Sequence, residues 1–367
     1  MWEVDLERFW KDDAVAQQEN CFFKGEQVAL GIRMSDECVF AELQEEGTPW
    51  MPIERSRRLE LNKRYNDKAE KIVGKRLLAE TLPDPRSELP YVKRIGEVFG
   101  GRYVYENATE WLMQSVEEAE ELEKLLDRVE NMDLRTFMLP ENWEAEKKRV
   151  YEEFGIKPQP MHHVRGPVTL ACSIFGAENL LYLYYDDPDL FERFGQVIGK
   201  TILGMAQVMD EEAGVTAQTA RGFSFADDNC CLMNPDMYRV FGYPVLKMVF
   251  DKYSPDEGDS RYQHSDSAMG HLLPILGELN LTGVNFGPTV LVPEIRKYLP
   301  KARIDGCIAP FTFMRNDVKK LTEETLRDIR DGFAYGGVSI TTAGSINDGS
   351  SLDSMRLMMS LIQQNRR

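Results

Sequence analysis

The chain has 367 residues, 43% apolar and 29% charged, and this composition excludes a disordered, collagen-like or disulfide-framework protein. Lysine and arginine number 44 against 61 aspartates and glutamates, and the net charge of −17 argues against binding to nucleic acid or to an anionic membrane. The six cysteines are sparse, and no stretch has the pattern of a signal peptide or of a membrane span. We therefore expect a cytoplasmic protein with no nucleic-acid and no membrane partner.

The first part of the chain is highly charged and favours helices. In residues 114–132, leucine and valine recur at helical spacing among glutamate and lysine, which predicts an amphipathic helix. Two shorter runs, 28–34 and 102–106, have the composition of strands. We interpret residues 1–155 as an N-terminal helical segment with the first elements of a larger domain, and residues 156–367 as the remainder of that domain, carrying the active site.

Beyond residue 155, short β-rich runs alternate with long helical stretches. A helix is predicted to begin after Asp187, which precedes Pro188, and another after Asn234, which precedes Pro235, because each pair combines an N-cap with a proline at the first helical position. Alternation of this kind predicts parallel strands joined by helices. Six strands are expected, at 160–166, 222–226, 261–264, 282–286, 302–308 and 337–342. With 28–34 and 102–106 they make the eight strands of an α/β (β/α)8 TIM barrel, which the N-terminal helical extension would cap.

A barrel of this kind carries its chemistry on the loops after its strands, so the residues there are the candidates for function. His264 and Asp266 stand two apart at a strand end, where their side chains point the same way and can share one ion or one substrate. Cys307 ends another strand, and sulfur, imidazole and carboxylate together suit zinc. We predict His264, Asp266 and Cys307 as metal ligands; a surface turn and a buried structural cysteine are the alternatives.

Two further strand ends carry charged residues. Asp227 and Asp228 follow one strand and are predicted as catalytic together with His264 and Asp266, although an acid pair also starts helices. His163 and Arg165 share a face of another strand and are predicted to bind substrate, as is Asn285. An arginine there suggests an anionic substrate group, with a salt bridge to a neighbouring acid as the alternative.

Several motifs for other chemistries are missing from the sequence. No glycine-rich phosphate loop, HExxH, CxxC or nucleophile elbow occurs. These absences leave nucleotide binding by such a loop, nucleophilic hydrolysis and thioredoxin-like redox chemistry without support.

The C-terminal half resembles the uroporphyrinogen decarboxylase superfamily in the order and spacing of its motifs. The segments that carry the resemblance are RGPVTLACSIFG (165–176), DDPDLFERF (186–194), ADDNCCLMNPDMYRVFGYPVLKMV (226–249), YQHSDSAMGHLLPILGELNLTGVNF (262–286) and RIDGCIAPFTF (303–313). The resemblance implies a (β/α)8 barrel. It also implies one of three activities: porphyrinogen decarboxylation, methylcobalamin-dependent methyl transfer, or demethylation of methoxylated or methylated compounds onto a corrinoid protein.

Departures from the motifs of two branches narrow this choice. The decarboxylases of the superfamily carry an arginine-rich MRQAGR segment that clamps substrate carboxylates, whereas VALGIRMSDECVF here offers only Arg33. The thiol methyltransferases place zinc on His-x-Cys and on a second cysteine after the last strand; here the matching positions hold His264 with Asp266, and Ser345. The resemblance therefore implies the third branch, with Asp227 or Asp228 near the methyl donor. Without a metal, Asp266 or His264 would act as a general acid.

We predict a methyltransferase that moves a methyl group from a small donor, such as a methoxylated aromatic or a methylated amine, to the cobalt of a corrinoid, with metal or acid activation of the leaving group. The chain lacks a DxHxxG-type cobalamin motif, so the corrinoid would arrive on a partner protein. A decarboxylase-like lyase acting on a different small acid and a non-catalytic barrel that binds a small molecule remain as alternatives. A homodimer is also left open.

Overall fold

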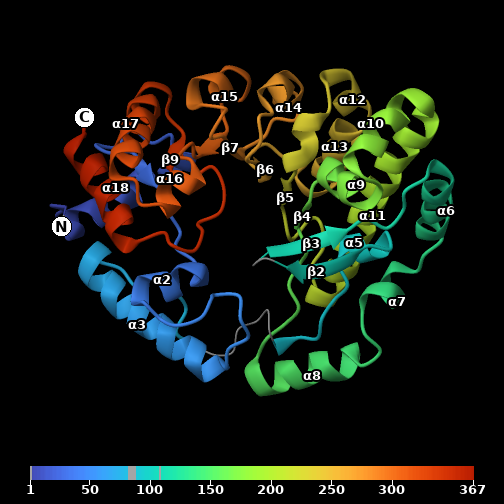
Figure 1. Cartoon of the computed structure of the whole chain (residues 1–367), viewed down its shortest axis with the longest axis horizontal. Helices are drawn as coiled ribbons and strands as arrows, with labels where there is room; N and C mark the ends of the chain where they lie inside the picture. Colours follow the sequence, from blue (N-terminus) through green and yellow to red (C-terminus); the bar gives the residue numbers. More distant parts are fainter. Residues whose placement is uncertain (1, 82–87, 107–108) are drawn as a thin grey trace. The chain divides into compact units, whose positions relative to one another are not determined.

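This computed structural model describes residues 2–81, 88–106 and 109–367 (Figure 1). The chain divides into two compact units: the first comprises Met1–Thr81, Ser265–Gly270 and Gly283–Arg367, and the second comprises Leu82–His264 and His271–Thr282. Each unit is described by itself. The division of the chain at residue 155 stays a prediction.

The first unit contains four parallel strands in the order β1-β9-β8-β7, connected by helices. The strands are β1 (Ala29–Leu30), β7 (Gly283–Phe286), β8 (Arg303–Asp305) and β9 (Val338–Ile340). The helices are α1 (Leu6–Ala16), η1 (Gln18–Cys21), η2 (Asp36–Cys38), α2 (Val39–Leu43), α3 (Arg55–Val73), α15 (Val292–Tyr298), α16 (Pro310–Met314), α17 (Val318–Tyr335) and α18 (Leu352–Gln364).

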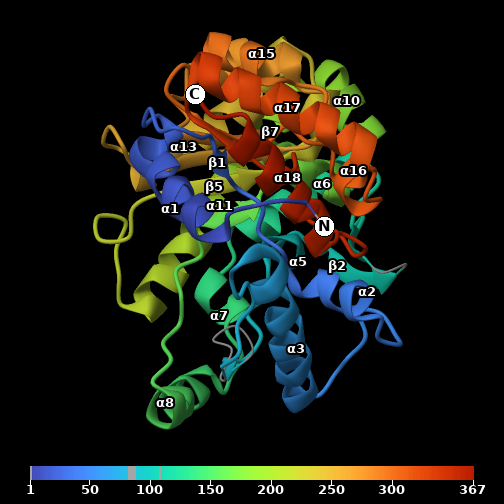
Figure 2. The same ribbon diagram turned by 90° about the vertical axis from the view of Figure 1, so that its left-hand side faces the viewer.

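Helices cover one face of the strands of the first unit. Gly332 of α17 lies against Val338 of β9, and Val338 pairs in register with Ile304 of β8, so both apolar side chains belong to the helix-covered face. Helices α17 and α18 pack together, and α3 packs on α18 (Figure 2). Arg303, Asp305 and Ser339 alternate with these apolar residues and therefore belong to the opposite face.

The second unit contains three parallel strands in the order β6-β5-β4 and a separate two-stranded sheet. Its strands are β2 (Arg102–Glu106), β3 (Thr109–Met113), β4 (His163–Arg165), β5 (Phe223–Ala226) and β6 (Arg261–Ser265), the last residue of which is counted with the first unit. Its helices are α5 (Ile95–Val98), α6 (Ala119–Glu130), α7 (Leu134–Met138), α8 (Trp143–Phe154), α9 (Pro167–Phe175), α10 (Ala177–Asp186), α11 (Pro188–Ala213), η3 (Asp228–Leu232), α12 (Pro235–Val240), α13 (Gly242–Tyr253), η4 (Gly270–Leu272) and α14 (Leu273–Gly277).

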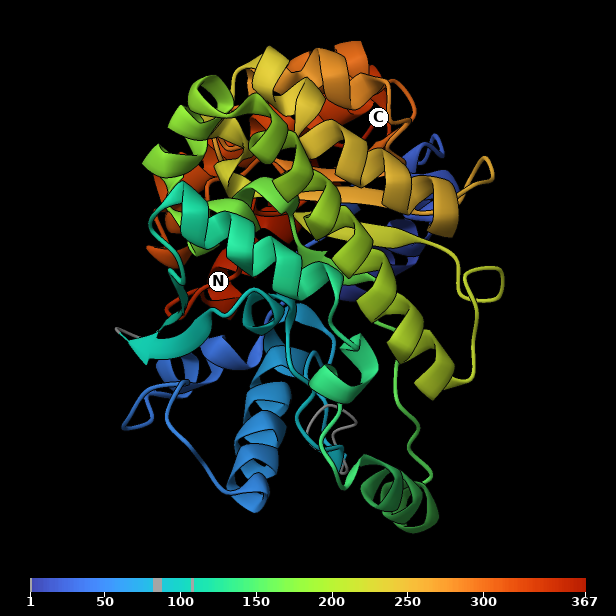
Figure 3. The ribbon, with the colours of Figure 1, turned by 90° about the vertical axis from the view of Figure 1, so that its right-hand side faces the viewer.

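Aromatic side chains attach the strands of the second unit to α13. Phe223 of β5 lies 5.4 Å from Tyr253 between ring centroids, and Phe225 lies 5.4 Å from Phe250. The long helix α11 buries one apolar stripe and packs against α6 (Figure 3). Helix α6 buries its leucines and valine on one side, which confirms the amphipathic helix predicted within residues 114–132. The predicted N-caps are also confirmed, because Asp187 and Asn234 each accept a hydrogen bond from the backbone three residues on.

The fold is α/β, with parallel strands that alternate with helices as in a TIM barrel. The six strands predicted beyond residue 155 are confirmed, and the run at 28–34 contributes the short β1. The expectation that 102–106 is a barrel strand is wrong. It pairs antiparallel with β3, because a neighbouring strand only a few residues away closes a hairpin with little loss of chain entropy. Among the described residues, no helix is long and apolar enough to cross a membrane.

Candidate functional site

Strands β4, β5 and β6 of the second unit have one face that carries polar side chains, and this face holds most of the candidate site residues. Strand register pairs His163 with Ser224, and in the next row it pairs Arg165 with Ala226 and Ala226 with His264. Register partners in parallel strands point to the same side, and this side is opposite to the one that Phe223 and Phe225 bury against α13.

This face is more open than a barrel interior normally is. Inward-facing positions of TIM barrels are mostly filled by branched apolar side chains. Here His163 is exposed, and Arg165, Ser224 and His264 are only partly buried. Of these residues, Arg165 and His264 lie at the carboxyl ends of β4 and β6, and polar groups that remain accessible there indicate a binding site for a small molecule.

Three side chains at this end of the strands form a candidate metal centre. Asp228, His264 and Asp266 each offer one ligand atom within 4.8 Å of the others. Nε2 of His264 lies 3.5 Å from Oδ1 of Asp228, and 41% of the Asp228 side chain is exposed. Asp266 follows His264 by two residues on the same chain segment, as the sequence predicted, and Asp228 stands two residues beyond Ala226, the register partner of His264.

The donor set of this cluster suits zinc. One imidazole nitrogen and two carboxylate oxygens are ligands that zinc accepts at about 2.0–2.2 Å, and three protein ligands leave one position open, as in catalytic zinc sites. Asp228 takes part where the sequence suggested Cys307: among the described residues, the group with mutually close ligand atoms does not include Cys307.

Asp227 and Asp228 are adjacent in the chain, but their side chains lie in different environments. Asp227 is fully buried, and its Oδ1 accepts a 2.7 Å hydrogen bond from the backbone of Thr169 in the first turn of α9. Burial raises the pKa of the Asp227 carboxyl to about 6, outweighing the hydrogen bonds from Thr169 and Val168. Gly166 allows this close contact, because a Cβ there would lie 2.2 Å from the Cβ of Asp227. Asp227 therefore fixes α9 beside the site, and its catalytic role stays a prediction.

His163 has a defined orientation. Its Nδ1 lies 2.8 Å from the Ser224 hydroxyl, which donates its own hydrogen to the carbonyl of His162 at 3.2 Å. With the Ser224 hydrogen given to this carbonyl, Nδ1 would be the protonated nitrogen and Nε2 would carry the lone pair. Although part of the His163 side chain is accessible, the protein atoms around its ring, together with His264, lower the pKa of His163, which favours the neutral ring. Sequence reasoning missed Ser224, although its alternation with Phe223 and Phe225 places it on the face of the site.

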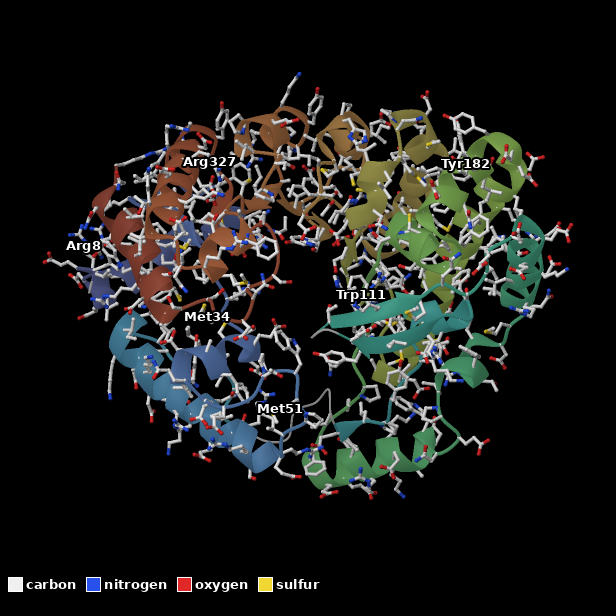
Figure 4. The ribbon with its side chains drawn as sticks, in the orientation of Figure 1. Arg8, Met34, Met51, Trp111, Tyr182 and Arg327 are labelled. Atoms are coloured by element: carbon white, nitrogen blue, oxygen red, sulfur yellow. The ribbon has the colours of Figure 1, made fainter. Side chains whose placement is uncertain are left out.

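The two remaining predicted site residues lie in the first unit. The Asn285 amide donates to the carbonyls of Asp305 and of Thr342, so both its hydrogens are engaged. Cys307 is fully buried, and its backbone carbonyl accepts a hydrogen bond from Arg327, the residue labelled in Figure 4. Burial raises the pKa of the Cys307 thiol, which favours the neutral form. Their predicted roles in substrate and metal binding stay predictions.

Comparisons with known proteins place this geometry in a family. The chain is similar to the methyltransferase from Methanosarcina mazei, with a TM-score of 0.53 and 17% identity over 83% of this chain and 85% of that one, and this likeness shows a shared fold. No curated protein matches the chain. The family model described as uroporphyrinogen decarboxylase (URO-D) matches residues 148–364, more than half of the chain. The chain therefore belongs to the uroporphyrinogen decarboxylase family.

Proposed function

We propose that the protein is a methyltransferase that moves a methyl group from a small methylated donor to the cobalt of a corrinoid carried by a separate protein. The observation that carries the proposal is the cluster of Asp228, His264 and Asp266 on the open polar face of a URO-D fold. The methyltransferase from Methanosarcina mazei has a similar fold, and this likeness supports the class of reaction.

The chemical task is to activate a poor leaving group. The bond between the methyl carbon and the donor heteroatom breaks, the electron pair stays on the heteroatom, and the acceptor supplies the pair for the new bond to carbon. A zinc ion would supply positive charge beside the leaving heteroatom. Asp228, His264 and Asp266 would hold the ion, and the exposed side of Asp228 leaves the centre accessible to the donor.

Other residues of the same face would orient the donor. Ser224 contacts Nδ1 of His163, and Nε2 of the same ring would accept a hydrogen bond from the donor. Asp227 anchors the start of α9 and so fixes the loop that follows Arg165. Because these positions are set before the donor binds, little of the binding energy is lost in ordering the site.

The proposal is tested by methyl transfer to a reduced corrinoid. Purified protein is incubated anaerobically with cob(I)alamin and a panel of methoxylated and methylated compounds, and methylcobalamin formation is followed by absorbance. We expect transfer from at least one donor, loss of transfer in His264→Ala and Asp228→Asn, and wild-type rates in Asp236→Asn. Asp236 is a matched control, because it is an exposed aspartate in the first turn of α12 in the same unit.

Other outcomes would contradict the proposal. Release of CO2 from an acid of the panel, without methylcobalamin, would identify a decarboxylase-like lyase. Binding of a panel compound without any turnover, and unchanged in the His264→Ala variant, would identify a non-catalytic binding protein.

A further inference from the structure

Among the residues that the structure describes, Arg165 has no partner carboxylate. The guanidinium is partly buried at the carboxyl end of β4, and its Nη1 donates a 3.2 Å hydrogen bond to the neutral hydroxyl of Ser173. Within the described parts of the chain, Arg165 makes no ion pair. An arginine offers five donors in a planar fork that matches a carboxylate, so most of its binding capacity is unused.

The acid that feels the charge of Arg165 is already engaged by another arginine. Glu110 on β3 feels the charge of Arg165, but it is bound through both oxygens by Arg94, at 2.5 and 2.9 Å. The salt bridge to a neighbouring acid, which the sequence left open for Arg165, is therefore not formed among the described residues.

Strand register sets the spacing between Arg165 and the metal cluster. Arg165, Ala226 and His264 are register neighbours across β4, β5 and β6. Neighbouring strands lie about 4.8 Å apart, so the Cα atoms of Arg165 and His264 are about 10 Å apart. The side chain between them, that of Ala226, is only a methyl group, so a ligand about one aromatic ring long could lie between the two ends of the row.

We propose that Arg165, assisted by the Ser173 hydroxyl, binds a carboxylate of the methyl donor, so that the site selects methylated acids over methylated amines. The carboxylate forms a charge-assisted, bidentate hydrogen-bonded pair with the guanidinium. The methylated heteroatom at the other end of the molecule then lies toward Asp228, His264 and Asp266. The identity of the ligand as a methyl donor rests on the proposed function, whereas anion binding at Arg165 does not.

The test measures binding without turnover. Isothermal titration calorimetry compares 4-methoxybenzoate with anisole, its analogue without the carboxylate, on the wild-type protein. We expect 4-methoxybenzoate to bind at least tenfold more tightly than anisole. Arg165→Gln should abolish this preference, Arg165→Lys should keep part of it, and Arg149→Gln, which removes an exposed arginine of α8, should leave it unchanged.

Several results would overturn the inference. Equal affinity of the wild-type protein for both ligands would do so, as would an unchanged preference in Arg165→Gln with a wild-type unfolding curve. Inorganic phosphate that displaces 4-methoxybenzoate as effectively as benzoate does would show a general anion site instead of a carboxylate site. A carboxylate preference that depends on Arg165, without methyl transfer from any donor, would refute the proposed function and leave the Arg165 site standing.

Discussion

In both units, the strand face turned away from the helices carries polar side chains. The two units differ in the hydrogen-bond and ion-pair partners of these side chains. In the first unit, Arg303 pairs with Asp305 at 2.9 Å, and the Asn285 amide donates to two backbone carbonyls. In the second unit, Arg165 contacts a neutral hydroxyl, and the carboxylate of Asp228 lies 3.5 Å from Nε2 of His264. Polar groups that stay accessible at strand ends are available to a ligand, whereas those of the first unit are held by the protein itself. This difference supports the proposal that the chemistry takes place on the face of the second unit.

The largest effect on activity is expected at the metal cluster, which has no counterpart among the residues compared in the first unit. His264→Ala removes the one nitrogen ligand, and we expect methyl transfer to fall by at least about 100-fold, because a lost ligand costs more than a lost supporting contact. The side chain is partly exposed, so the free energy of unfolding should change little. Activity assays and urea denaturation measure the two quantities. A stability loss that matches the activity loss would make His264 a structural residue.

Arginine replacements compare the two faces directly. Arg303→Met leaves Asp305, a largely buried carboxylate, without its cation, and should lower the free energy of unfolding by about 2 kcal/mol. Arg165→Met breaks no ion pair and should change that free energy by less than about 0.5 kcal/mol. Urea denaturation of both variants checks this difference. Equal losses of unfolding free energy in the two variants would show that Arg165 stabilises the fold, which would contradict its proposed role in ligand binding.

The ion-paired carboxylate of Glu212, on α11, predicts how the free energy of unfolding depends on pH. Burial tends to raise the pKa of Glu212, but hydrogen bonds from Lys147, Trp143 and Arg135 lower it to about 2. Because the pKa is lower in the folded state, this stabilisation is fully present above pH 4.5 and is lost as the pH falls toward 2.

Glu212→Gln should therefore cost about 2 kcal/mol of unfolding free energy at pH 7 and much less near pH 2. Denaturation at both pH values measures the two differences. A cost that is the same at both would mean that the charge of Glu212 contributes nothing.

The smallest effect is expected at Ser224. Ser224→Ala removes the hydrogen bond that orients His163, and one such bond contributes about 1 kcal/mol, so we expect about a fivefold fall in kcat. Metal content should stay the same, since Ser224 is not one of the proposed ligands, and any rise in KM should be small, since Ser224 acts on the donor only through His163. Steady-state kinetics with metal analysis tests this. Loss of metal in the variant would place His163 among the ligands.

Local patterns in the sequence predicted the strands and helix starts well, because alternation and capping are properties of adjacent residues. They also placed His264 and Asp266 on one side of one strand. They grouped Asp228 with this pair as a catalytic residue but did not indicate it as a metal ligand, because the distance between Asp228 and His264 depends on the register between β5 and β6. Two-residue alternation likewise could not show that Arg165 lacks an acid, since Arg94 takes Glu110 from a distant part of the chain.

The central claim is that Asp228, His264 and Asp266 hold a metal ion, and X-ray absorption at the zinc edge of the purified protein tests it most directly. We predict about one zinc per chain with a single imidazole and otherwise oxygen ligands near 2.0–2.2 Å. A sulfur scatterer at about 2.3 Å would contradict this ligand set and indicate Cys307. A protein that binds no metal even after incubation with zinc would contradict the claim altogether.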